Sequence, residues 1–358
     1  MSSIAVNAIT DANGGSTTTI NSVTPNVNNV LGKNRIINGN MMIDQRNAGA
    51  SVTPVGTTYT IDRFVAYLTA ASKFSVQQNA GSVTPPAGFT NYLGVTSLSA
   101  YSVLTEDYFS IGHNLEGLNT ADLAWGTADA KTVTLSFQVY SSLTGTFGGA
   151  LVNSDNSRSY PFTYSISTAN TWEKKTVTIA GDTTGTWLTT NGVGLKLRFG
   201  LGSGTTYSGT AGAWASTAYF TATGATSVVG TSGATFYITG VQLEAGSSAT
   251  EFEHRQYGTE LSLCQRYYQN PDLSGTRYLW AYPIDNYTGT HYRAFTYIFP
   301  TPMRTSPTCT VSASSNGSFA GGSPNIQQTH PSHALIRADT TATTAYAFIT
   351  GFTASAEL

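Results

Sequence analysis

Short strand-like segments that recur between turn-forming clusters constrain the fold of this chain more than any other feature. Between about residues 33 and 253, these segments alternate apolar and polar residues or are rich in β-branched and aromatic ones: 58–69, 73–80, 101–115, 131–142, 160–168, 173–181, 193–203 and 234–246. This pattern is typical of β-strands, and few helical periods compete with it. So many strands in one unit predict an all-β jelly roll or β-sandwich, in which two sheets cover each other's apolar faces.

The charge of the chain is low both in total and in net. Among 358 residues there are 17 basic and 19 acidic ones, and the formal net charge is −2. Proteins that bind nucleic acid need clustered Lys and Arg to neutralise phosphates, so no nucleic-acid partner is expected. No apolar run approaches the roughly 20 residues of a membrane span, so no membrane insertion is expected. The opening residues also lack the basic and apolar regions of a signal peptide. The composition resembles that of secreted or cell-surface proteins, yet no export signal is seen. This combination fits a virion protein that is assembled in a host cytoplasm.

The ends of the chain differ from this β-rich region. Residues 1–32 contain two alternating stretches around the turn sequence DANGG, which predicts a hairpin for attachment or oligomerisation. A lone hairpin is marginal in water, so it needs another chain or the next domain, and the alternative is a disordered tail. Residues 270–358 return to strand-like segments, and they predict a second, smaller β-sandwich at the distal end.

A single helix is predicted between the two β regions, over residues 254–269. Tyr257, Leu261, Cys264 and Tyr268 follow one another at spacings of four, three and four, which places them on one packing stripe. We interpret this helix as a neck, although a helix that caps its own β domain fits the pattern equally well. Cys264 and Cys309 are expected to be buried thiols and not a disulfide bridge.

The stretch NRIINGNMMIDQRNAG, residues 34–49, concentrates charge beside an apolar run. Its Arg35, Asp44 and Arg46, with Asp62 and Arg63 further along, are predicted to form structural ion pairs at the rim of the core. Unpaired buried charges are too costly to keep, which favours a structural role over a catalytic one. The stretch therefore marks where the first domain begins.

Three motifs together carry a resemblance to a known family. NRIINGNMMIDQRNAG, YTIDRF and FYITGVQLEAGSSATEFEHRQYGTELSLCQRYYQ occur in order, with WGTADAKTVTLSFQVYSSLTGTFGGAL and NTWEKKTVTIAGDTTGTW between them. This block, about residues 33–269, resembles one found in bacteriophage tail fibre and tail-associated proteins. There it forms a jelly roll similar to carbohydrate-binding modules, which often hold Ca²⁺. FPTPMRTSPT and the final FTASAEL resemble the distal domain of such proteins.

The resemblance implies a homotrimeric virion protein that joins other tail proteins through its N-terminus and binds host-surface polysaccharide. No cofactor is expected beyond a possible structural Ca²⁺, and no EF-hand-like run of acidic residues announces one. Avidity in a trimer can strengthen weak sugar sites about a hundredfold or more. A purely structural tail or capsid decoration protein remains the main alternative.

Trp214 is the first candidate for glycan contact. It lies in a stretch rich in Gly, Ser and Ala, with Tyr207 and Tyr219 nearby, and a flat ring beside polar groups suits a sugar. These three residues predict an exposed platform. The alternative is that Trp214 folds back to plug the end of the jelly roll.

The loops of the distal domain are the second candidate, because loops on a rigid scaffold carry recognition. The residues concerned are Asn286, Tyr287, His291, His330 and His333. The sequence HPSH at 330–333 has a metal-like spacing, but a solvent-exposed loop is the favoured interpretation, and no metal site is predicted.

Hydrolysis of polysaccharide is the least favoured function. A glycosidase needs two facing carboxylates, and the acidic residues that could supply them form no spaced motif: Asp62, Glu106, Asp107, Glu116, Asp122 and Glu244. The coil repeats of a parallel β-helix and the G-x-S-x-G motif are also missing from the sequence. The sequence thus predicts a non-enzymatic recognition protein.

Overall fold

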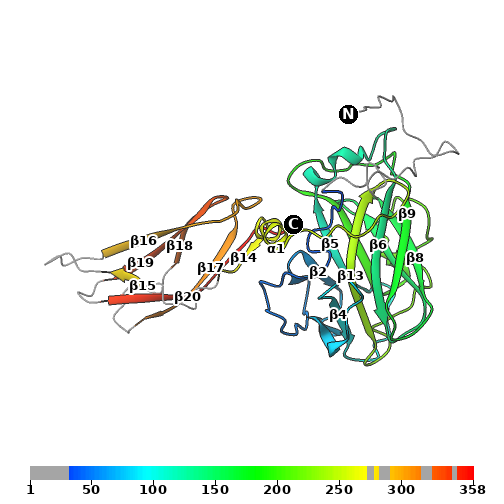
Figure 1. The fold of residues 1–358 in the computed structure, drawn as a ribbon, viewed down its shortest axis with the longest axis horizontal. Helices are drawn as coiled ribbons and strands as arrows, with labels where there is room; N and C mark the ends of the chain where they lie inside the picture. The colour runs from blue at the N-terminus through cyan, green and yellow to red at the C-terminus, as the bar shows by residue number, and fades with distance from the viewer. Residues whose placement is uncertain (1–31, 272–277, 282–290, 316–324, 341–344) are drawn as a thin grey trace, which may run out of the picture.

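Figure 1 presents a computed structural model of the chain, which describes residues 32–271, 278–281, 291–315, 325–340 and 345–358. The hairpin predicted for residues 1–32 lies outside this part, except for Gly32. Two sheets of the first domain pack face to face. The first sheet has the order β1 (Thr58–Ile61), β2 (Phe64–Leu68), β5 (Tyr108–Glu116), β10 (Val193–Ser203), β7 (Gly145–Val152), β8 (Ser159–Ile166). The second has the order β3 (Phe74–Gln78), β4 (Leu93–Ser97), β13 (Thr235–Ala245), β6 (Val133–Ser141), β9 (Glu173–Ile179).

All the strand pairs in these two sheets are antiparallel, and alternate residues point into the space between the sheets. Phe199 pairs with Ile111 in the first sheet, and Phe236 lies on the inner face of the second. All three side chains are at most 1% exposed. Burying each such side chain contributes roughly 1.5–3 kcal/mol relative to exposure, so this apolar layer holds the sandwich together.

The outer face of the first sheet is covered by the strap, residues 204–229. The strap contains the 3₁₀ turn η5 (Thr205–Tyr207) and the parallel pair β11 (Ser208–Gly209) and β12 (Thr221–Ala222). A Cβ added to Gly148 or Gly200 would lie 2.4 or 2.6 Å from the Oγ1 of Thr221, so these glycines permit the close approach. We call this outer face the covered face and the outer face of the second sheet the open face.

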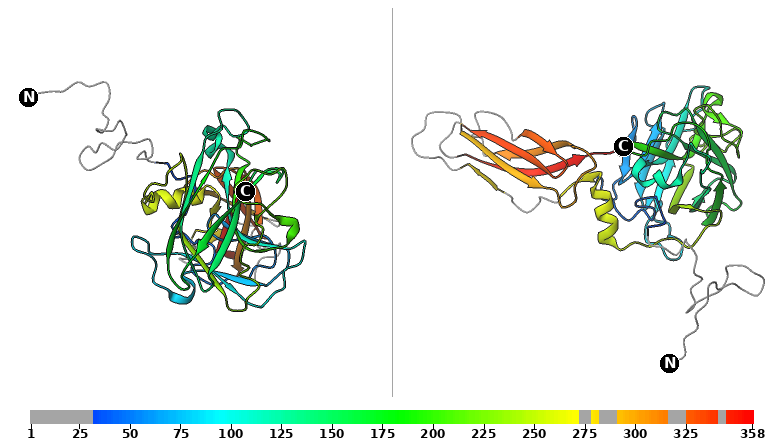
Figure 2. Two further views of the ribbon diagram at one scale, coloured as in Figure 1. Left: turned by 90° about the vertical axis from the view of Figure 1, so that its right-hand side faces the viewer. Right: turned by 90° about the horizontal axis from the view of Figure 1, so that it is seen from above.

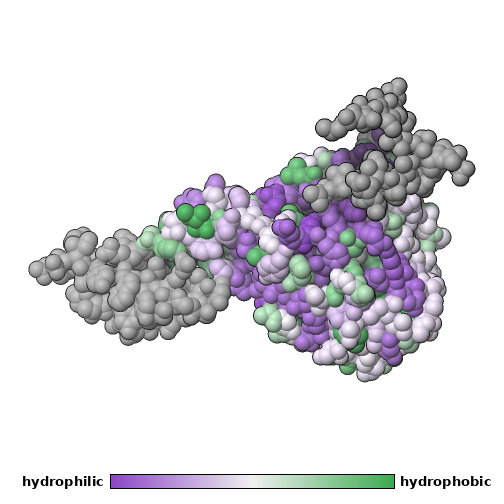
Figure 3. Space-filling model, in the orientation of Figure 1, coloured by the Kyte–Doolittle hydropathy of each residue, from purple (hydrophilic) through white to green (hydrophobic). Residues whose placement is uncertain are grey.

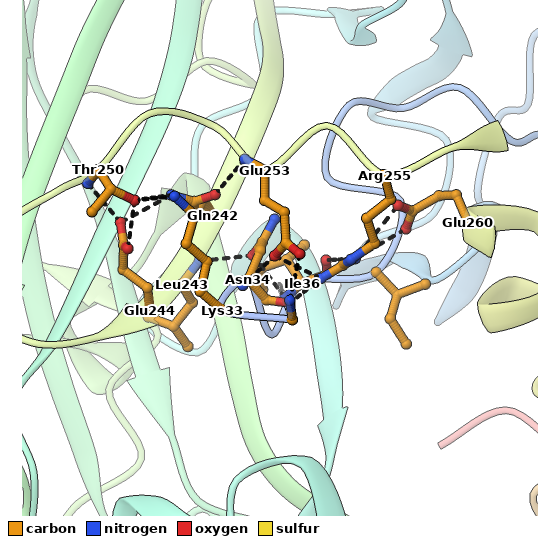
Figure 4. Close-up of polar contacts among 12 residues, drawn as sticks. Lys33, Asn34, Ile36, Gln242, Leu243, Glu244, Thr250, Glu253, Arg255 and Glu260 are labelled. Atoms are coloured by element: carbon orange, nitrogen blue, oxygen red, sulfur yellow. Dashed lines mark hydrogen bonds and ion pairs between the residues drawn. The ribbon is translucent and has the colours of Figure 1, made fainter. Parts of the chain in front are cut away.

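The start and the end of the sandwich are joined by a polar network (Figure 4). The Asn34 side chain accepts a hydrogen bond from Leu243 N at 3.1 Å, and Asn34 N donates to Glu253 at 2.8 Å. Arg255 donates to the Asn34 carbonyl and pairs with Glu260 at 3.3 Å. Two sequence motifs more than 200 residues apart therefore bind each other and join the start of the sandwich to its end.

The arginines of the opening stretch form ion pairs, but with partners that were not predicted. Arg35 pairs with Asp122 at 2.7 Å. Arg46 and Arg63 both pair with Glu357 near the end of the sequence, and the Arg63 side chain is fully buried. The predicted pairing of these arginines within their own cluster is wrong, because the partners arrive through tertiary folding.

The two aspartates of that cluster bind backbone and amide groups. Asp44 accepts hydrogen bonds from Asn47 N at 3.0 Å and Gly49 N at 2.8 Å, which closes a turn. Asp62 accepts from Gln45 N at 2.7 Å and Gln45 Nε2 at 2.6 Å. Burial nevertheless raises the pKa of Asp62 to about 7, against the opposing effect of Arg46. These aspartates shape the loop and form no ion pair with an arginine of the cluster.

The helix α1 spans Tyr257–Gln265 and is shorter than predicted. Cys264 is fully buried and packs with Ile37, Ile43 and Tyr267. Tyr257, predicted on the packing stripe, is 60% exposed, which corrects that prediction. Leu261 packs against the same cluster, whereas Tyr268 lies beyond the helix in β14 (Tyr268–Gln269). Cys264 and Cys309 are both free.

The distal β region follows α1 (Figure 2). One sheet joins β14, β20 (Ala345–Ser355) and β15 (Tyr278–Ala281), with β17 (Thr308–Ser315) on β20, and another has the order β16 (His291–Ile298), β19 (His333–Thr340), β18 (Asn325–His330). Phe299, Met303, Ile336 and Phe352 form its small core. The all-β fold class, with a sandwich, one helix and a second smaller β unit, is confirmed.

Three further 3₁₀ turns, all in the first domain, are η2 (Ala80–Ser82), η3 (Gly117–Asn119) and η4 (Ala121–Leu123).

Within the described residues, no helix has the length and apolar character needed to cross a membrane. The surface that faces the viewer in Figure 3 is mostly hydrophilic over the sandwich, with scattered hydrophobic side chains. These scattered apolar residues are normal for a protein surface, so any recognition site has to be found by its geometry.

Candidate ligand-binding groove

Trp214 is not the open platform that the sequence predicted. Its ring is half-buried and packs edge to face on Trp125 at 5.3 Å and Trp187 at 5.4 Å between centroids. Its indole N–H donates to the carbonyl of Ala180 at 2.8 Å. The structure therefore agrees with the alternative in which Trp214 helps to close the end of the sandwich.

Tyr207 and Tyr219 do not join Trp214 on one surface. Tyr207 stacks on Phe220, with ring centroids 5.1 Å apart and an interplanar angle of 8°. The Tyr219 ring lies against Gly209, where an added Cβ would come within 2.2 Å of it. The three predicted residues belong to separate contacts of the strap, because sequence proximity did not place them side by side.

The covered face is filled by a buried arginine. Arg198 on β10 is 4% exposed, and its guanidinium lies 4.0 Å from the Tyr67 ring centroid and 3.9 Å from that of Phe220. Burial lowers the pKa of Arg198, partly opposed by Tyr67 and Tyr108. Stacking of this kind partly replaces lost hydration, and it leaves little surface on this face for a ligand.

The open face carries a groove with a volume of about 280 Å³. Its floor contains Ser136 and Gln138 from β6 and Gly240 from a bulge in β13. Ser136 and Gln138 alternate with inward-pointing Phe137, so the strand period places both of them on the outer face. Neither polar side chain is engaged by another side chain in the described part of the protein. The floor thus offers hydroxyl and amide groups to a ligand.

Three rings form one wall of the groove. Phe89 and Phe252 lie 5.1 Å apart, and His254 lies 5.3 Å from Phe89 and 4.9 Å from Phe252. Gly240 has φ of 62°, and a Cβ at this position would lie 2.6 Å from the Phe89 ring. The glycine therefore lets the Phe89 ring rest directly on the sheet. The predicted helix, 254–269, includes His254, and no role is predicted for Phe89 or Phe252, so this wall was missed.

The groove lining also carries balanced charge. Lys174 on β9 pairs with Glu251 at 3.6 Å, and their side chains are 47% and 97% exposed. An exposed pair of this kind contributes little to stability, commonly 0–1 kcal/mol. Both side chains are therefore free to reorient toward a polar ligand without loss of the fold.

An aromatic ledge continues the groove along the same face. Tyr140 and Tyr237 stack at 5.3 Å with an interplanar angle of 6°, and Trp172 lies 5.4 Å from Tyr140. Tyr140 follows Gln138 by two residues on β6, so both point outward. Burial raises the pKa of Tyr237, which is 3% exposed, whereas Tyr140 and Trp172 are half-buried and keep ring surface accessible.

The acidic residues considered for hydrolysis are all engaged elsewhere. Each accepts hydrogen bonds from side-chain or backbone groups: Asp62, Glu106, Asp107, Glu116, Asp122 and Glu244. Among the described residues that line the groove, Glu251 is the only carboxylate. A glycosidase commonly needs a second carboxyl group within about 5–10 Å across the bond.

The distal histidines lie at the turn between β18 and β19. The rings of His330 and His333 stack 5.1 Å apart, and Ser332 Oγ lies 2.8 and 3.1 Å from their Nδ1 atoms. His291 begins β16, while Asn286 and Tyr287 lie outside the described residues. No group of three His, Cys, Asp or Glu able to hold a metal ion occurs in the described ranges. Tip recognition stays a prediction.

Comparisons with solved structures give weak likenesses to glycan-related proteins. The enzymatically active domain of bacteriophage CBA120 tailspike protein 4 is 10% identical with a TM-score of 0.32, over 60% of this chain and 22% of that one. The family 11 carbohydrate-binding module of Clostridium thermocellum Lic26A-Cel5E is 14% identical with a TM-score of 0.28, over 57% and 100%. The CBM22-1 xylan-binding domain of Paenibacillus barcinonensis Xyn10C is 12% identical with a TM-score of 0.25, over 57% and 99%.

No protein-family model matches the chain, and no curated protein matches it in sequence. Likenesses at these identities and TM-scores transfer neither a ligand nor an activity. What the chain binds has to be argued from its own groove.

Proposed function

We propose that this protein recognises a glycan through the groove on the open face and performs no chemistry on it. One observation carries the proposal: the same groove has both an aromatic wall and a polar floor. The wall consists of Phe89, Phe252 and His254, and the floor contains Ser136 and Gln138. A sugar presents C–H faces that pack on rings and hydroxyl edges that bond to amides and hydroxyls.

The setting that we propose is the tail of a bacteriophage virion. The ordered motifs of residues 33–269 support it, because they resemble tail fibre proteins. In this setting the protein is a homotrimer, attached to other tail proteins through residues 1–32, with the distal β region toward the host. Three weak grooves then act together, since linkage raises the effective concentration of the second and third sites.

A structural spacer is the second candidate function. The ion pairs of Arg46 and Arg63 with Glu357 favour it, because they connect the distal end of the sequence firmly to the sandwich. A rigid connection of this kind serves a spacer as well as it serves a receptor-binding tip. A structural Ca²⁺ stays an expectation from resemblance, and nothing in the proposed binding depends on it.

The decisive experiment measures binding of the purified full chain to host envelope polysaccharide by calorimetry, with product analysis of the same sample. Phe252→Ala and Gln138→Ala remove a ring and a floor amide, and Thr176→Ala on the same face outside the groove is the matched control. Loss of one ring contact, worth ~1–1.5 kcal/mol, is about a tenfold loss of affinity. We expect each groove variant to weaken binding by at least about that factor while the control and the glycan chain length stay unchanged.

Two outcomes would overturn the proposal. Equal affinity of wild type and both groove variants would remove the groove as the binding site. Shortened polysaccharide would replace recognition by hydrolysis as the function. A particle of three chain masses in light scattering is expected for the fibre setting, and a monomer would contradict it.

A further inference from the structure

A second, smaller cavity lies at one end of the sandwich, apart from the groove. Its volume is about 190 Å³, and it shares no lining residue with the groove. Its apolar lining consists of Leu123 and Trp125 near η4 together with Trp187, Leu188 and Leu195. Ligand pockets for drug-sized molecules commonly hold about 300–1,000 Å³, so this cavity fits one sugar unit or less.

The tryptophans of this cavity offer ring surface and no free donor. Trp125 and Trp187 meet edge to face with centroids 4.8 Å apart. The Trp125 indole N–H donates to the Lys131 carbonyl at 2.8 Å, and that of Trp187 donates to the Thr184 carbonyl at 3.1 Å. Because both N–H groups are already bonded, the surface they present is purely apolar.

The backbone at the cavity adopts a conformation that is unusual for its residue. Ala124, which lines the cavity, has φ of 53° and ψ of 29° at the end of η4. The left-handed region is unfavourable for a residue with a Cβ, and such positions cluster at functional sites. Ala124 N donates to the Ala121 carbonyl at 3.2 Å, so the turn is held in this form.

The rim of the cavity combines hydroxyl groups with an exposed leucine. Thr120, Thr127 and Thr189 line it, and Leu188 is 38% exposed. The Thr127 hydroxyl donates to the Ala124 carbonyl at 2.7 Å and accepts from Asp129 N at 3.2 Å, which leaves one lone pair as an acceptor. The Thr120 hydroxyl donates to the Gly117 carbonyl at 3.2 Å, and its oxygen lone pairs remain as acceptors. The apolar side chains at the bottom of the cavity suit a methyl group of a ligand, and the hydroxyl oxygens at the rim can accept hydrogen bonds from the hydroxyl groups of a sugar ring.

We infer that this cavity binds a methyl-bearing sugar unit, with the methyl group against Trp125 and Trp187 and the ring hydroxyls at the threonine rim. The inference rests on the proposed function in that the sugar is part of the recognised glycan. Two sugar chemistries carry such a methyl group, 6-deoxyhexoses and N-acetylhexosamines. An unmodified hexose lacks it and fills the apolar bottom poorly.

The test titrates the full chain with the free sugars L-rhamnose, N-acetyl-D-glucosamine and D-glucose while tryptophan fluorescence is recorded. Free sugars are used because a methyl glycoside would add a methyl group to every probe. Trp172 lies at the ledge of the open face, so the titrations use a Trp172→Phe background to silence that site. We expect a saturable fluorescence change with one of the two methyl-bearing sugars. Glucose is expected to bind at least about tenfold more weakly, since one buried methyl or methylene is worth roughly 1–3 kcal/mol.

Leu188→Ser opens the apolar wall at an exposed position and should weaken binding at least about fivefold without loss of folding. Leu104→Ser, at a surface leucine that is 62% exposed elsewhere, is the matched control and should bind like wild type. Trp187→Ala should abolish the response, and circular dichroism reports whether that variant folds. If Trp187→Ala does not fold, Leu188→Ser still tests the cavity.

The outcomes separate this inference from the proposed function. A saturable response that is equal for all three sugars, or no response at all while polysaccharide still binds the groove, would overturn the inference alone. If a methyl-bearing sugar binds but Phe252→Ala and Gln138→Ala leave the polysaccharide affinity unchanged, the cavity stands and the groove is removed as the binding site.

Discussion

The two outer faces of the sandwich use aromatic residues in opposite ways. On the covered face, Tyr67 and Phe220 enclose Arg198, and the strap closes over them. On the open face, Phe89 and Phe252 border a cavity instead of a side chain. Both faces have similar strands, so the difference comes from what the connecting segments place on them. The comparison shows that aromatic content alone does not mark a binding face, since rings already occupied by a cation have no surface left.

Phe220→Ala should produce the largest effect, because it removes the ring that caps Arg198. We expect the free energy of unfolding to fall by about 3–5 kcal/mol, as for other buried phenylalanines. Phe252→Ala on the open face should cost much less, about 1 kcal/mol, because its ring is half-buried. Urea denaturation of both variants measures the contrast. Similar losses in the two would show that the faces do not differ in this way.

Gly148→Ala should disrupt the contact between the strap and the first sheet. The new Cβ would lie 2.4 Å from Thr221 Oγ1 and 3.0 Å from the backbone N of Ala222, so the strap has to move. Overpacking of this kind costs about 1–3 kcal/mol. Gly56→Ala, at a position with open space around the added Cβ, is the control and should be neutral or slightly stabilising. Thermal unfolding would test the pair, and an unaffected Gly148 variant would mean that the strap is not tightly seated.

Lys196 on the covered face should make stability depend on alkaline pH. Burial first, and then the neighbouring charge of Arg198, lower the pKa of Lys196 to about 8 from 10.5. Between these two values the unfolded chain binds more protons than the folded one, so the free energy of unfolding rises with pH. Because the side chain is partly exposed, we expect a rise of only about 1 kcal/mol.

Lys196→Met should remove this rise, measured as the difference between wild type and variant at pH 7.5 and 10.5. A difference that stays constant across this range would contradict the lowered pKa. The variant also keeps the stem that packs on the face, so lost packing does not imitate the effect.

Thr176→Ala on the open face should give the smallest effect. The side chain is exposed on β9, and such substitutions commonly change stability by less than about 0.5 kcal/mol. Differential scanning calorimetry resolves a change of this size. A loss of unfolding free energy above about 1 kcal/mol would mean that the Thr176 side chain is not exposed but packs against other groups on the open face.

The sequence predicted the β-sandwich well because the evidence is local. Alternation in 131–142 and 193–203 makes β6 and β10, and their apolar residues become the core. The candidate site was harder, because its residues converge from five separate segments around Phe89, Gln138, Lys174, Gly240 and Phe252. One available signal is the alternation of rings in Phe252 and His254, although the predicted boundary between the first domain and the helix separates the two residues.

Trp214 illustrates why residue type is insufficient. A tryptophan among small residues was expected to be exposed, yet those small residues allow the strap to bring it against Trp125 and Trp187. The ion pairs fail in the same way. Arg63 is predicted to pair within a cluster that contains Asp44 and Asp62, but its partner Glu357 lies near the other end of the sequence.

By itself, the sequence determined the fold class and the approximate position of α1, since periodicity and turn residues act over a few neighbours. Only the tertiary structure decided which sheet face stays open, which charges pair and where rings gather into cavities. These features depend on contacts between segments 50 to 300 residues apart, and strand pattern says nothing about which loops fold over which face.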